Sequence, residues 1–266
     1  MNNTYFSGKV VWVTGASSGI GKALALKLAQ NGANLILSAR NQKALEEVKL
    51  NCKNSENHLV LPLDLTKNET FPAALEKVKS HFGRIDILVN NGGVSQRATA
   101  VETDLATVRQ LFEVDFFGHV ALTNLVVPQM REQGGGQILV ISSIAGKFGF
   151  FLRSSYSAAK HALHGYFESL ALEEEKSGIH VTIACPGKIN TPISTKALTG
   201  KGASHGKMDD NQAGGMPVEE CAEELIKALK AKKREVLIGK GELLAVYLKR
   251  FFPGLFWRII RKQSAT

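Results

Sequence analysis

Short apolar runs alternate with segments of helical periodicity along most of the chain. The runs are rich in β-branched residues and rarely interrupted by polar ones, which is typical of strands buried on both faces of a sheet. They cover residues 9–14, 34–39, 58–62, 85–90, 136–142, 180–185 and 235–238. Between them, apolar residues recur at the spacing of amphipathic helices over 20–30, 42–52, 71–81, 105–131, 155–175 and 218–232.

This alternation predicts an α/β fold, with one doubly wound, Rossmann-type parallel sheet of about seven strands and helices on both of its faces. We expect residues 1–240 to form this single domain. Residues 195–216 interrupt the pattern, because they are polar, rich in glycine and longer than an ordinary connection. On composition alone they are consistent with a disordered surface insertion.

The first apolar run ends at a cluster of glycines, and a helical pattern follows at once. The segment is Thr14-Gly-Ala-Ser-Ser-Gly-Ile-Gly21. Glycines let a backbone approach a ligand closely, and a helix N-terminus presents free N–H groups with partial positive charge. Strand, glycine turn and helix together therefore predict a phosphate-binding site. The alternative is a tight turn whose small residues serve packing alone.

A second pattern, Tyr156-Ser-Ala-Ala-Lys160, carries candidate acid–base chemistry, with Ser143 thirteen residues upstream. Residues four apart on a helix lie on one face, so the phenol and the ammonium would be neighbours. A cation held near a phenol favours its ionised form, so the pair can exchange a proton with an alcohol or carbonyl oxygen. Taken alone the spacing is weak evidence, because many exposed helices contain it.

Together these segments resemble the short-chain dehydrogenase/reductase family, and the resemblance covers nearly the whole chain. Five motifs occur in the family's order, and residues 142–166 look most like its hydroxysteroid- and lipid-type reductases. The motifs are Thr14-Gly-Ala-Ser-Ser-Gly-Ile-Gly21, Asn90-Asn-Gly-Gly93, Ser143 within Ile141-Ser-Ser-Ile-Ala-Gly146, the pair of Tyr156 and Lys160, and Pro186-Gly187 with Thr191. Gly92 stands where the family usually has Ala.

The resemblance implies strand order 3-2-1-4-5-6-7, a substrate loop over 195–216, and a reaction between an alcohol and a ketone or aldehyde. It gives Ser143 a hydrogen bond to the substrate oxygen, Tyr156 the proton transfer, and Lys160 contacts with both Tyr156 and the nicotinamide ribose. The expected cofactor-binding residues are Gly15, Ser17, Ser18, Gly19, Ile20, Arg40, Asp64, Leu65, Asn91, Gly92, Tyr156, Lys160, Pro186, Gly187, Ile189 and Thr191.

One catalytic position departs from the family. Asp115 stands where the family usually has an Asn whose main-chain carbonyl holds a water leading to the Lys. A carbonyl survives the exchange, so the relay can survive too. A buried carboxylate, however, needs partners or must take up a proton.

The end of the second strand bears on nucleotide choice. An acidic side chain there accepts hydrogen bonds from the adenosine ribose and selects NAD(H). Here the sequence is Ser38-Ala39-Arg40, with no carboxylate, and the Arg40 guanidinium can pair with a 2′-phosphate. We therefore predict that NADP(H) is preferred over NAD(H), the alternative being that Arg40 is merely exposed. Asp64 would reach the adenine by resemblance, or it begins the next helix.

The net charge of +9 is concentrated near the C-terminus, where the last 45 residues hold 11 Lys and Arg against 4 Asp and Glu. No nucleic-acid-binding motif accompanies this charge, so we expect no nucleic-acid partner. Residues 241–266 form a basic, amphipathic extension rich in aromatic residues. Its apolar face would pack on its own domain or a partner subunit, or lie on an anionic membrane.

The remaining features restrict the setting. Cys52, Cys185 and Cys221 are scattered, which predicts neither disulfides nor a metal site and fits a reducing compartment. The N-terminus lacks the pattern of a signal peptide, so we expect a cytoplasmic location, with possible peripheral membrane contact. His161 and His164, near Lys160, are interpreted as surface or packing residues.

The hypothesis from the sequence is an NADP(H)-dependent oxidoreductase acting on a small, apolar carbonyl or alcohol, with Tyr156 as the acid–base group. The family commonly forms homodimers or homotetramers, so the resemblance implies the same here. Two alternatives belong to other classes: a nucleotide-binding regulator with impaired catalysis, supported only by Asp115, and a peripheral membrane protein that works through residues 241–266.

Overall fold

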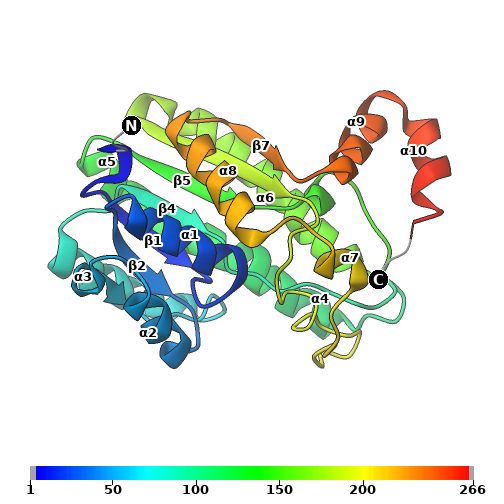
Figure 1. The fold of residues 1–266 in the computed structure, drawn as a ribbon, viewed down its shortest axis with the longest axis horizontal. Coiled ribbons are helices and arrows are strands. Elements are labelled where there is room, and N and C mark those ends of the chain that lie inside the picture. Colours follow the sequence, from blue (N-terminus) through cyan, green and yellow to red (C-terminus); the bar gives the residue numbers. More distant parts are fainter. Residues whose placement is uncertain (1–3, 264–266) are drawn as a thin grey trace.

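A seven-stranded parallel sheet with order β3-β2-β1-β4-β5-β6-β7 forms the centre of the protein (Figure 1). The computed structural model describes residues 4–263. The predicted fold class and strand order are confirmed. The strands are β1 (Val10–Thr14), β2 (Asn34–Ser38), β3 (Leu59–Val60), β4 (Ile87–Asn90), β5 (Gly136–Ile141), β6 (Ile179–Pro186) and β7 (Glu235–Ile238).

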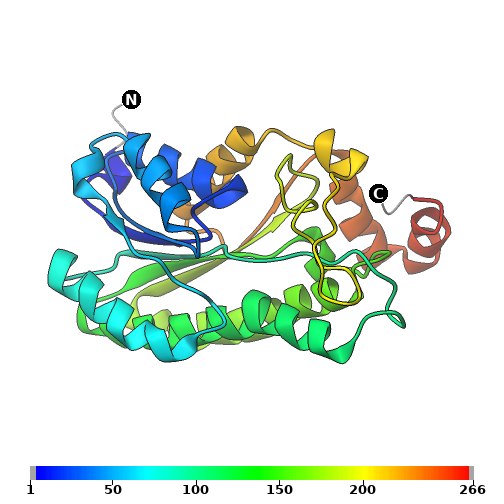
Figure 2. The ribbon, with the colours of Figure 1, turned by 90° about the horizontal axis from the view of Figure 1, so that it is seen from below.

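Helices cover both faces of the sheet, as the apolar character of the strands predicts (Figure 2). One core joins one face to α1 (Gly19–Gln30), α2 (Gln42–Leu50) and α8 (Val218–Lys230). The other core joins the opposite face to α3 (Phe71–Phe82), α5 (Gly118–Glu132) and α6 (Ser154–Glu173). Alternate residues of β1 enter the two cores, with Val11 and Val13 on one side and Trp12 on the other.

The largest difference from the predicted elements is β3, which has two residues where the pattern predicts five over 58–62. Among the described residues it is the edge strand, and it pairs with β2 through Ile36–Leu59 and Leu37–Val60. Beyond Val60 the chain stays beside β2, because the Leu61 amide donates to the Leu37 carbonyl at 3.0 Å and the Leu63 amide donates to the Ala39 carbonyl at 3.1 Å. The pattern therefore located the strand, but only two of the five predicted residues have regular strand pairing.

The long helix predicted over 105–131 is one continuous helix with a change of geometry inside it. It consists of α4 (Leu105–Phe112), a π-helical turn η4 (Glu113–Phe117) and α5. By length and composition Leu105–Glu132 could span a membrane, but its inner face lies in the core beneath the sheet. The π turn contains Asp115, and such turns occur frequently at functional sites.

The two segments outside the regular pattern lie at the same end of the sheet, beyond the carboxyl ends of the strands (Figure 1). The 195–216 segment is folded and contains a short helix, α7 (Asp210–Ala213). After β7, the chain forms α9 (Leu244–Phe251) and α10 (Pro253–Ile260). Pro253 separates these two short helices, because its ring starts a helix well but cannot continue one.

Candidate active site

The glycine turn between β1 and α1 has the geometry of a phosphate cradle. Gly15 and Gly19 have φ values of 63° and 54°, which L side chains rarely adopt. A Cβ at Gly21 would lie 2.4 Å from the Gly15 carbonyl oxygen, so only glycine allows the turn to close this tightly. The N-cap side chain of Ser18 makes no capping hydrogen bond, so the first amides of α1 remain available to an anion. This backbone fits a dinucleotide diphosphate.

A polar lock joins this turn to the end of β4. The Thr14 hydroxyl donates to the Val89 carbonyl at 3.0 Å and accepts from the backbone amides of Asn91 and Gly92. The Asn91 side-chain amide donates to the Thr14 carbonyl at 2.9 Å. The Asn–Asn segment therefore has a structural task that its sequence match alone does not reveal.

Gly92, where the family usually has Ala, also has a local explanation. A Cβ at this position would lie 2.5 Å from Cδ1 of Leu65. The tip of Leu65 thus fills the volume that an alanine methyl group would occupy. Because that tip belongs to a flexible side chain, the departure concerns packing rather than the chemistry of the site.

All sixteen predicted cofactor-binding residues and Ser143 line one cavity of about 1060 Å³. The cavity extends from the glycine turn, past the carboxyl ends of the strands, to the 195–216 segment and the C-terminal helices. This position agrees with the rule that ligands of open α/β sheets bind outside the carboxyl ends of the strands. Arg40 is an exposed residue at the cavity rim, and Asp64 uses its Oδ1 to accept hydrogen bonds from Thr66.

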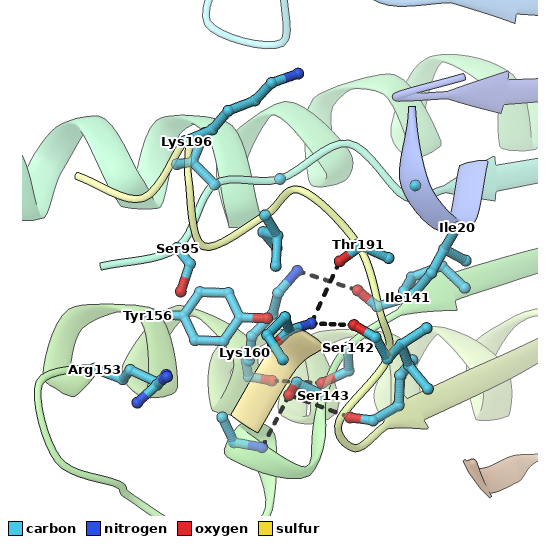
Figure 3. A pocket seen from close by; sticks show the side chains of 18 of the residues that line it. Ile20, Ser95, Ile141, Ser142, Ser143, Arg153, Tyr156, Lys160, Thr191 and Lys196 are labelled. Atoms are coloured by element: carbon cyan, nitrogen blue, oxygen red, sulfur yellow. Dashed lines mark hydrogen bonds between the residues drawn. The ribbon is translucent and has the colours of Figure 1, made fainter. Parts of the chain in front are cut away.

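Ser143, Tyr156 and Lys160 meet at the centre of this cavity (Figure 3). Ser143 follows β5 and donates to the Pro186 carbonyl at 3.4 Å, while its Oγ accepts from the Ala145 amide. Lys160 is almost fully buried; its Nζ donates to the Ile141 carbonyl at 3.1 Å and lies 5.6 Å from the centre of the Tyr156 ring. A phenol, a cation and a second hydroxyl thus face one space.

A residue that the sequence motifs do not include holds the start of α6, the helix that carries Tyr156 and Lys160. Gln96, which is fully buried, accepts from the backbone amides of Ser155 at 2.8 Å and Tyr156 at 3.4 Å. Its own amide donates to Thr103 at 2.7 Å. The side chain thereby satisfies the first amides of α6 and sets the position at which Tyr156 enters the cavity. No local sequence signal connects residue 96 with residue 156.

Comparison with known proteins settles the family. A profile of the short chain dehydrogenase family matches residues 9–202. The chain belongs to the short-chain dehydrogenase/reductase family. Accordingly it is an oxidoreductase of the class that acts on CH–OH groups and uses a nicotinamide nucleotide, NAD or NADP.

Individual relatives match over nearly the full chain. The chain is 39% identical to mouse dehydrogenase/reductase SDR family member 7B, over 99% of this chain and 83% of the mouse protein. It is 40% identical to human dehydrogenase/reductase SDR family member 7, over 96% of this chain and 77% of the human protein.

Two crystal structures of the family superpose closely. A short-chain dehydrogenase from Streptomyces avermitilis is 30% identical, has a TM-score of 0.81, and aligns over 96% of each chain. A short-chain dehydrogenase/reductase from Burkholderia phymatum, solved in complex with NAD, has a TM-score of 0.83 over 94% of this chain and 95% of its own, at 22% identity.

Asp115, the position where this chain departs from the family's usual Asn, is fully buried in the π turn, behind the lining of the cavity. Its Oδ1 accepts from the Val94 amide at 2.8 Å, and its Oδ2 has no partner among the described residues. Burial raises the pKa of Asp115 to about 6, while the Lys160 charge and the Val94 amide act in the opposite direction. The carboxyl therefore keeps its proton to a higher pH than an ordinary Asp, whose pKa is 3.8.

His119 is a second buried polar residue that the motifs do not include. Its Nε2 lies 2.7 Å from the Gly92 carbonyl, which can only accept, so Nε2 carries the proton. Burial and the nearby Lys160 lower the pKa of His119 to about 3, so the ring is neutral at physiological pH. The sequence does contain a signal for His119, because it follows Asp115 by four residues, and residues with this spacing lie on the same face of a helix.

The 195–216 segment is held over the cavity by a buried ion-pair cluster. Asp209 receives a two-point contact from the Arg97 guanidinium, and both side chains are almost fully buried. Arg153, at the start of α6, donates to the same carboxylate at 2.9 Å. Burial and the neighbouring Arg97 lower the pKa of Arg153 to about 10. The folded state of this segment therefore depends on charges brought together from three parts of the sequence.

The C-terminal helices close the other side of the cavity. Phe256 and Ile260 of α10 are buried against Phe148, with ring centres of Phe148 and Phe256 5.3 Å apart. Leu248, Ile259 and further residues of this segment line the cavity. One face of the extension thus packs on its own domain, which was one of the two predicted outcomes.

Proposed function

We propose that this chain is an NADP(H)-dependent reductase or dehydrogenase that interconverts an apolar ketone or aldehyde and the corresponding alcohol. The observation that carries the proposal is the meeting of Ser143, Tyr156 and Lys160 in the cavity that also contains the glycine turn. A nucleotide cradle and an acid–base pair in one cavity match the needs of hydride transfer coupled to proton transfer.

Three side chains have assigned roles. In the reductive direction, the Tyr156 hydroxyl gives its proton to the substrate oxygen, and in the oxidative direction it takes that proton back. The Lys160 ammonium stabilises negative charge on the phenol and binds the nicotinamide ribose. The Ser143 hydroxyl donates to the substrate oxygen after it gives up its hydrogen bond to the Pro186 carbonyl. That hydrogen bond is long, at 3.4 Å. A bound nicotinamide supplies or accepts the hydride.

The proposed cofactor lies along the sixteen lining residues named from the sequence. The amides at the start of α1 would bind its diphosphate, and Arg40 at the rim would bind the 2′-phosphate of NADP(H). The absence of a carboxylate at the end of β2 removes a repulsion against that phosphate. The positive charge of Arg40 and the absence of a carboxylate at the end of β2 therefore both support NADP(H).

Apolar side chains near the catalytic residues favour an apolar substrate. Phe148, Phe150 and Leu248 line the cavity wall, and Leu198 of the 195–216 segment completes it. Asp115 keeps a proton relay possible through its main-chain carbonyl, as in the family. A catalytically impaired regulator would need a damaged triad, and Ser143, Tyr156 and Lys160 are intact.

The test is oxidation of NADPH by the full-length protein against steroid, retinoid, acyl and sugar carbonyls. We expect turnover on one or more apolar ketones or aldehydes, and loss of that turnover in Tyr156→Phe, which removes only the proton donor. Wild-type turnover by Tyr156→Phe would contradict the mechanism. Nucleotide binding without turnover on any carbonyl would favour the regulator instead.

We infer a second property for the C-terminal extension, namely peripheral contact with an anionic membrane. The support is the outer face of α9 and α10, where Phe251 is 66% exposed and Trp257 53% exposed. Lys249, Arg250 and Arg258 lie on the same two helices, and no acidic residue follows Glu242. Exposed aromatic side chains together with basic residues on neighbouring helices suit the interface of an anionic bilayer.

Co-sedimentation with vesicles tests this second proposal. We expect binding to vesicles of phosphatidylcholine with phosphatidylserine and weaker binding to phosphatidylcholine alone. The double variant Phe251→Ser, Trp257→Ser should lose binding. Leu50→Ser, which alters a 76% exposed apolar residue at the end of α2, is the matched control and should bind normally. Equal binding by all proteins would contradict the proposal, and dimerisation through the exposed helices would appear as a change of mass instead.

We also propose a cytoplasmic homodimer or homotetramer assembled through the long helices. Phe117 in the π turn and Leu172 of α6 are large apolar side chains exposed on those helices. Light scattering of the wild type and of Phe117→Ser measures the assembly. A monomer in the wild type would contradict it.

A further inference from the structure

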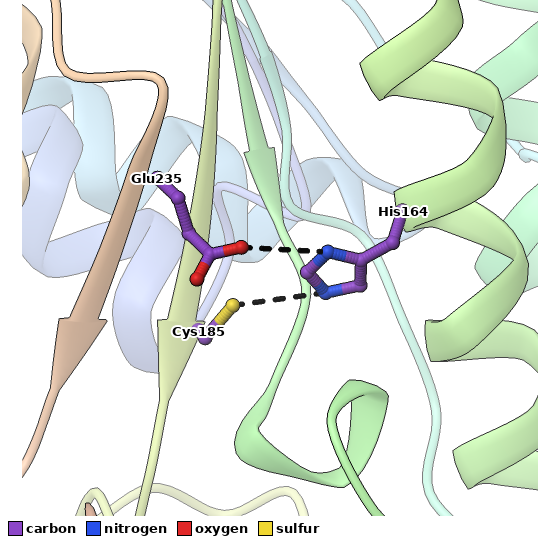
Figure 4. Close-up of side chains that lie close together, drawn as sticks. All are labelled: His164, Cys185 and Glu235. Atoms are coloured by element: carbon purple, nitrogen blue, oxygen red, sulfur yellow. Dashed lines mark hydrogen bonds and ion pairs between the residues drawn. The ribbon is translucent and has the colours of Figure 1, made fainter. Parts of the chain in front are cut away.

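A polar cluster that includes His164, Cys185 and Glu235 lies between α6, β6 and β7 (Figure 4). Its centre is the buried imidazole of His164, one turn after Lys160 on α6. The Nε2 atom lies 3.1 Å from Ser142 Oγ and 3.7 Å from Cys185 Sγ. The sequence allows a packing role on this helix for His164, but it does not predict these partners.

The cluster could be taken for a metal site, because ligand atoms of His164, Cys185 and Glu235 lie within 4.8 Å of one another. The other partners argue against that interpretation. The Lys147 ammonium lies 3.2 Å from His164 Nδ1 and forms an ion pair with Glu235, so a cation already occupies this side. Burial also raises the pKa of the Cys185 thiol to about 12, which disfavours the thiolate that a metal would need.

Lys147 determines the tautomer of the imidazole. An ammonium can only donate, so Nδ1 of His164 accepts from Lys147 and the proton of the neutral ring lies on Nε2. Nε2–H then donates to Ser142 Oγ. The Ser142 hydroxyl donates in turn to the Lys160 carbonyl at 3.3 Å. The result is one directed chain of hydrogen bonds from Lys147 through His164 and Ser142 to the main chain at Lys160.

This chain of hydrogen bonds connects the segment that carries Ser143 with the helix that carries Tyr156 and Lys160. Ser142 precedes Ser143 at the end of β5, and its amide is held by the Ala184 carbonyl of β6 at 2.8 Å. Lys160 and His164 belong to the helix that also carries Tyr156. Space is tight here, since a Cβ at Gly146 would lie 2.6 Å from Ser142 Oγ and 3.0 Å from His164 Nε2. A change in the imidazole is therefore transmitted to the separation between Ser143 and the Tyr156–Lys160 pair.

We propose that His164 is a positioning residue that, through Ser142, sets Ser143 against Tyr156 and Lys160, and that its protonation breaks this alignment. The proposal rests on the roles given above to Ser143, Tyr156 and Lys160. A proton on Nδ1 would face the Lys147 ammonium, and two cations would then compete for the acceptors around them. The hydrogen-bond chain requires the neutral ring.

The surrounding charges decide the pH range. Glu168 of α6 lies 3.4 Å and Glu235 of β7 3.8 Å from Nδ1, and both favour protonation. Burial and Lys147 oppose it and prevail, so the pKa of His164 lies below its ordinary value of 6.5. Near pH 7 the ring is neutral and the chain intact. Activity that depends on the chain is lost as the pH falls below that pKa.

The test compares His164→Gln, His164→Leu and the wild type with a carbonyl substrate and saturating NADPH. A Gln amide can replace Nε2–H as the donor to Ser142, but it does not titrate. We expect His164→Leu to lose kcat by about tenfold with unchanged NADPH affinity, since small misplacements of reacting groups have effects of this order or larger. His164→Gln should stay within about threefold of the wild type and should lose less activity than the wild type at acid pH.

Two controls separate position from packing. Cys185→Ala removes a neighbour of Nε2 that is not in the chain and should leave kcat unchanged; a large loss together with bound zinc in the wild type would favour a metal site. Ser142→Ala breaks the chain at its next link, so its effect should not add to that of His164→Leu.

Full turnover by His164→Leu, or an acid limb in His164→Gln as steep as in the wild type, would overturn the proposal. If His164→Leu fails to fold, the pH profile of His164→Gln still decides. Tyr156→Phe distinguishes the proposed mechanism from the proposed role of His164. If Tyr156→Phe is inactive and His164→Leu is fully active, only the role of His164 is contradicted.

Discussion

The two halves of the cavity are built in different ways. On the cofactor side, the glycine turn of β1–α1 and the Thr14–Asn91 lock are made largely of backbone and of short segments at strand ends. On the substrate side, the walls depend on side chains far apart in sequence, such as Arg97 with Asp209, and Phe148 with Phe256.

This difference indicates where the two halves tolerate change. A backbone cradle depends on a few glycines and leaves its other side chains free, so it persists among proteins with different substrates. A wall made from distant side-chain pairs can be replaced pair by pair, which alters the substrate and leaves the cradle alone. Perturbations of the two halves should therefore separate into effects on cofactor and effects on substrate.

The largest expected effects are those of Tyr156 and Lys160, which lie where the cofactor side and the substrate side of the cavity meet. Tyr156→Phe should lower turnover by roughly 10²- to 10⁴-fold, the usual contribution of general acid–base catalysis, and leave NADPH affinity unchanged. Lys160→Ala should lose turnover and weaken NADPH as well, because it would touch both the phenol and the ribose. Fluorescence titration with NADPH and steady-state kinetics provide the two readouts. A Lys160→Ala protein that binds NADPH normally would place Lys160 on the substrate side only.

On the substrate side, Asp209→Ala should reduce stability by about 3–5 kcal/mol, because it leaves the buried Arg97 guanidinium and the partly buried Arg153 guanidinium without their shared carboxylate. The KM for the carbonyl substrate should rise, while NADPH affinity should change little. Urea unfolding and kinetics measure the two effects. The exposed pair Lys79–Glu76 is a matched control, and Glu76→Ala should change stability by less than about 1 kcal/mol.

The contribution of Asp115 to the stability of the fold should depend on pH, and it can be measured separately from any effect on turnover. Its pKa in the folded chain, about 6, exceeds the ordinary value of 3.8, so the folded state holds the proton more tightly than the unfolded state. The resulting stabilisation is present below pH 3.8 and is lost as the pH rises through about 6. Asp115→Asn, whose amide oxygen can still accept from Val94, should therefore gain stability relative to the wild type by up to about 3 kcal/mol at pH 8. Melting curves at pH 5 and pH 8 check this, and an equal difference at both would contradict it.

On the cofactor side, Arg40→Ala tests the choice of nucleotide. The wild type should bind NADPH at least about tenfold more tightly than NADH, which corresponds to about 1.4 kcal/mol. The variant should lose this preference by weakening NADPH and leaving NADH nearly unchanged. Equal dissociation constants for both nucleotides in the wild type would end the argument from Arg40.

The smallest expected effect is that of Asp115→Asn on turnover. If only the main-chain carbonyl at this position serves the relay, the rate should stay within about threefold, or under about 0.7 kcal/mol of barrier. A loss of tenfold or more at pH 7 in a folded protein would assign the carboxylate a direct part.

What the sequence predicted follows the same division. The alternation of strands and helices and the glycine turn rest on short-range patterns, whereas the sheet order and the grouping of Ser143 with Tyr156 rest on the resemblance to the family. The structure has this sheet order and brings the glycine turn, Ser143 and Tyr156 to one cavity. Gln96 and Asp209 give no local signal, because their partners are 59 and 112 residues away. His164 is interpreted from the sequence as a surface or packing residue for the same reason, because the sequence around it contains no signal for its contacts with Ser142 and Lys147.

The π turn at Glu113–Phe117 has a consequence for insertions and deletions in this chain. Each residue of an α-helix advances the side-chain direction by about 100°. A π turn bonds residue i to residue i+5, so it takes up one more residue than an α turn. Deleting one residue from Glu113–Phe117 would therefore convert the turn to α geometry and leave α4 and α5 in nearly the same relative orientation. A deletion within a purely α-helical part, such as the middle of α5, would instead rotate the preceding segment by about 100°, and with it Leu111, which packs with Tyr156 and Leu198. The extra residue is thus absorbed locally, and we expect a one-residue deletion to be better tolerated inside the turn than beside it.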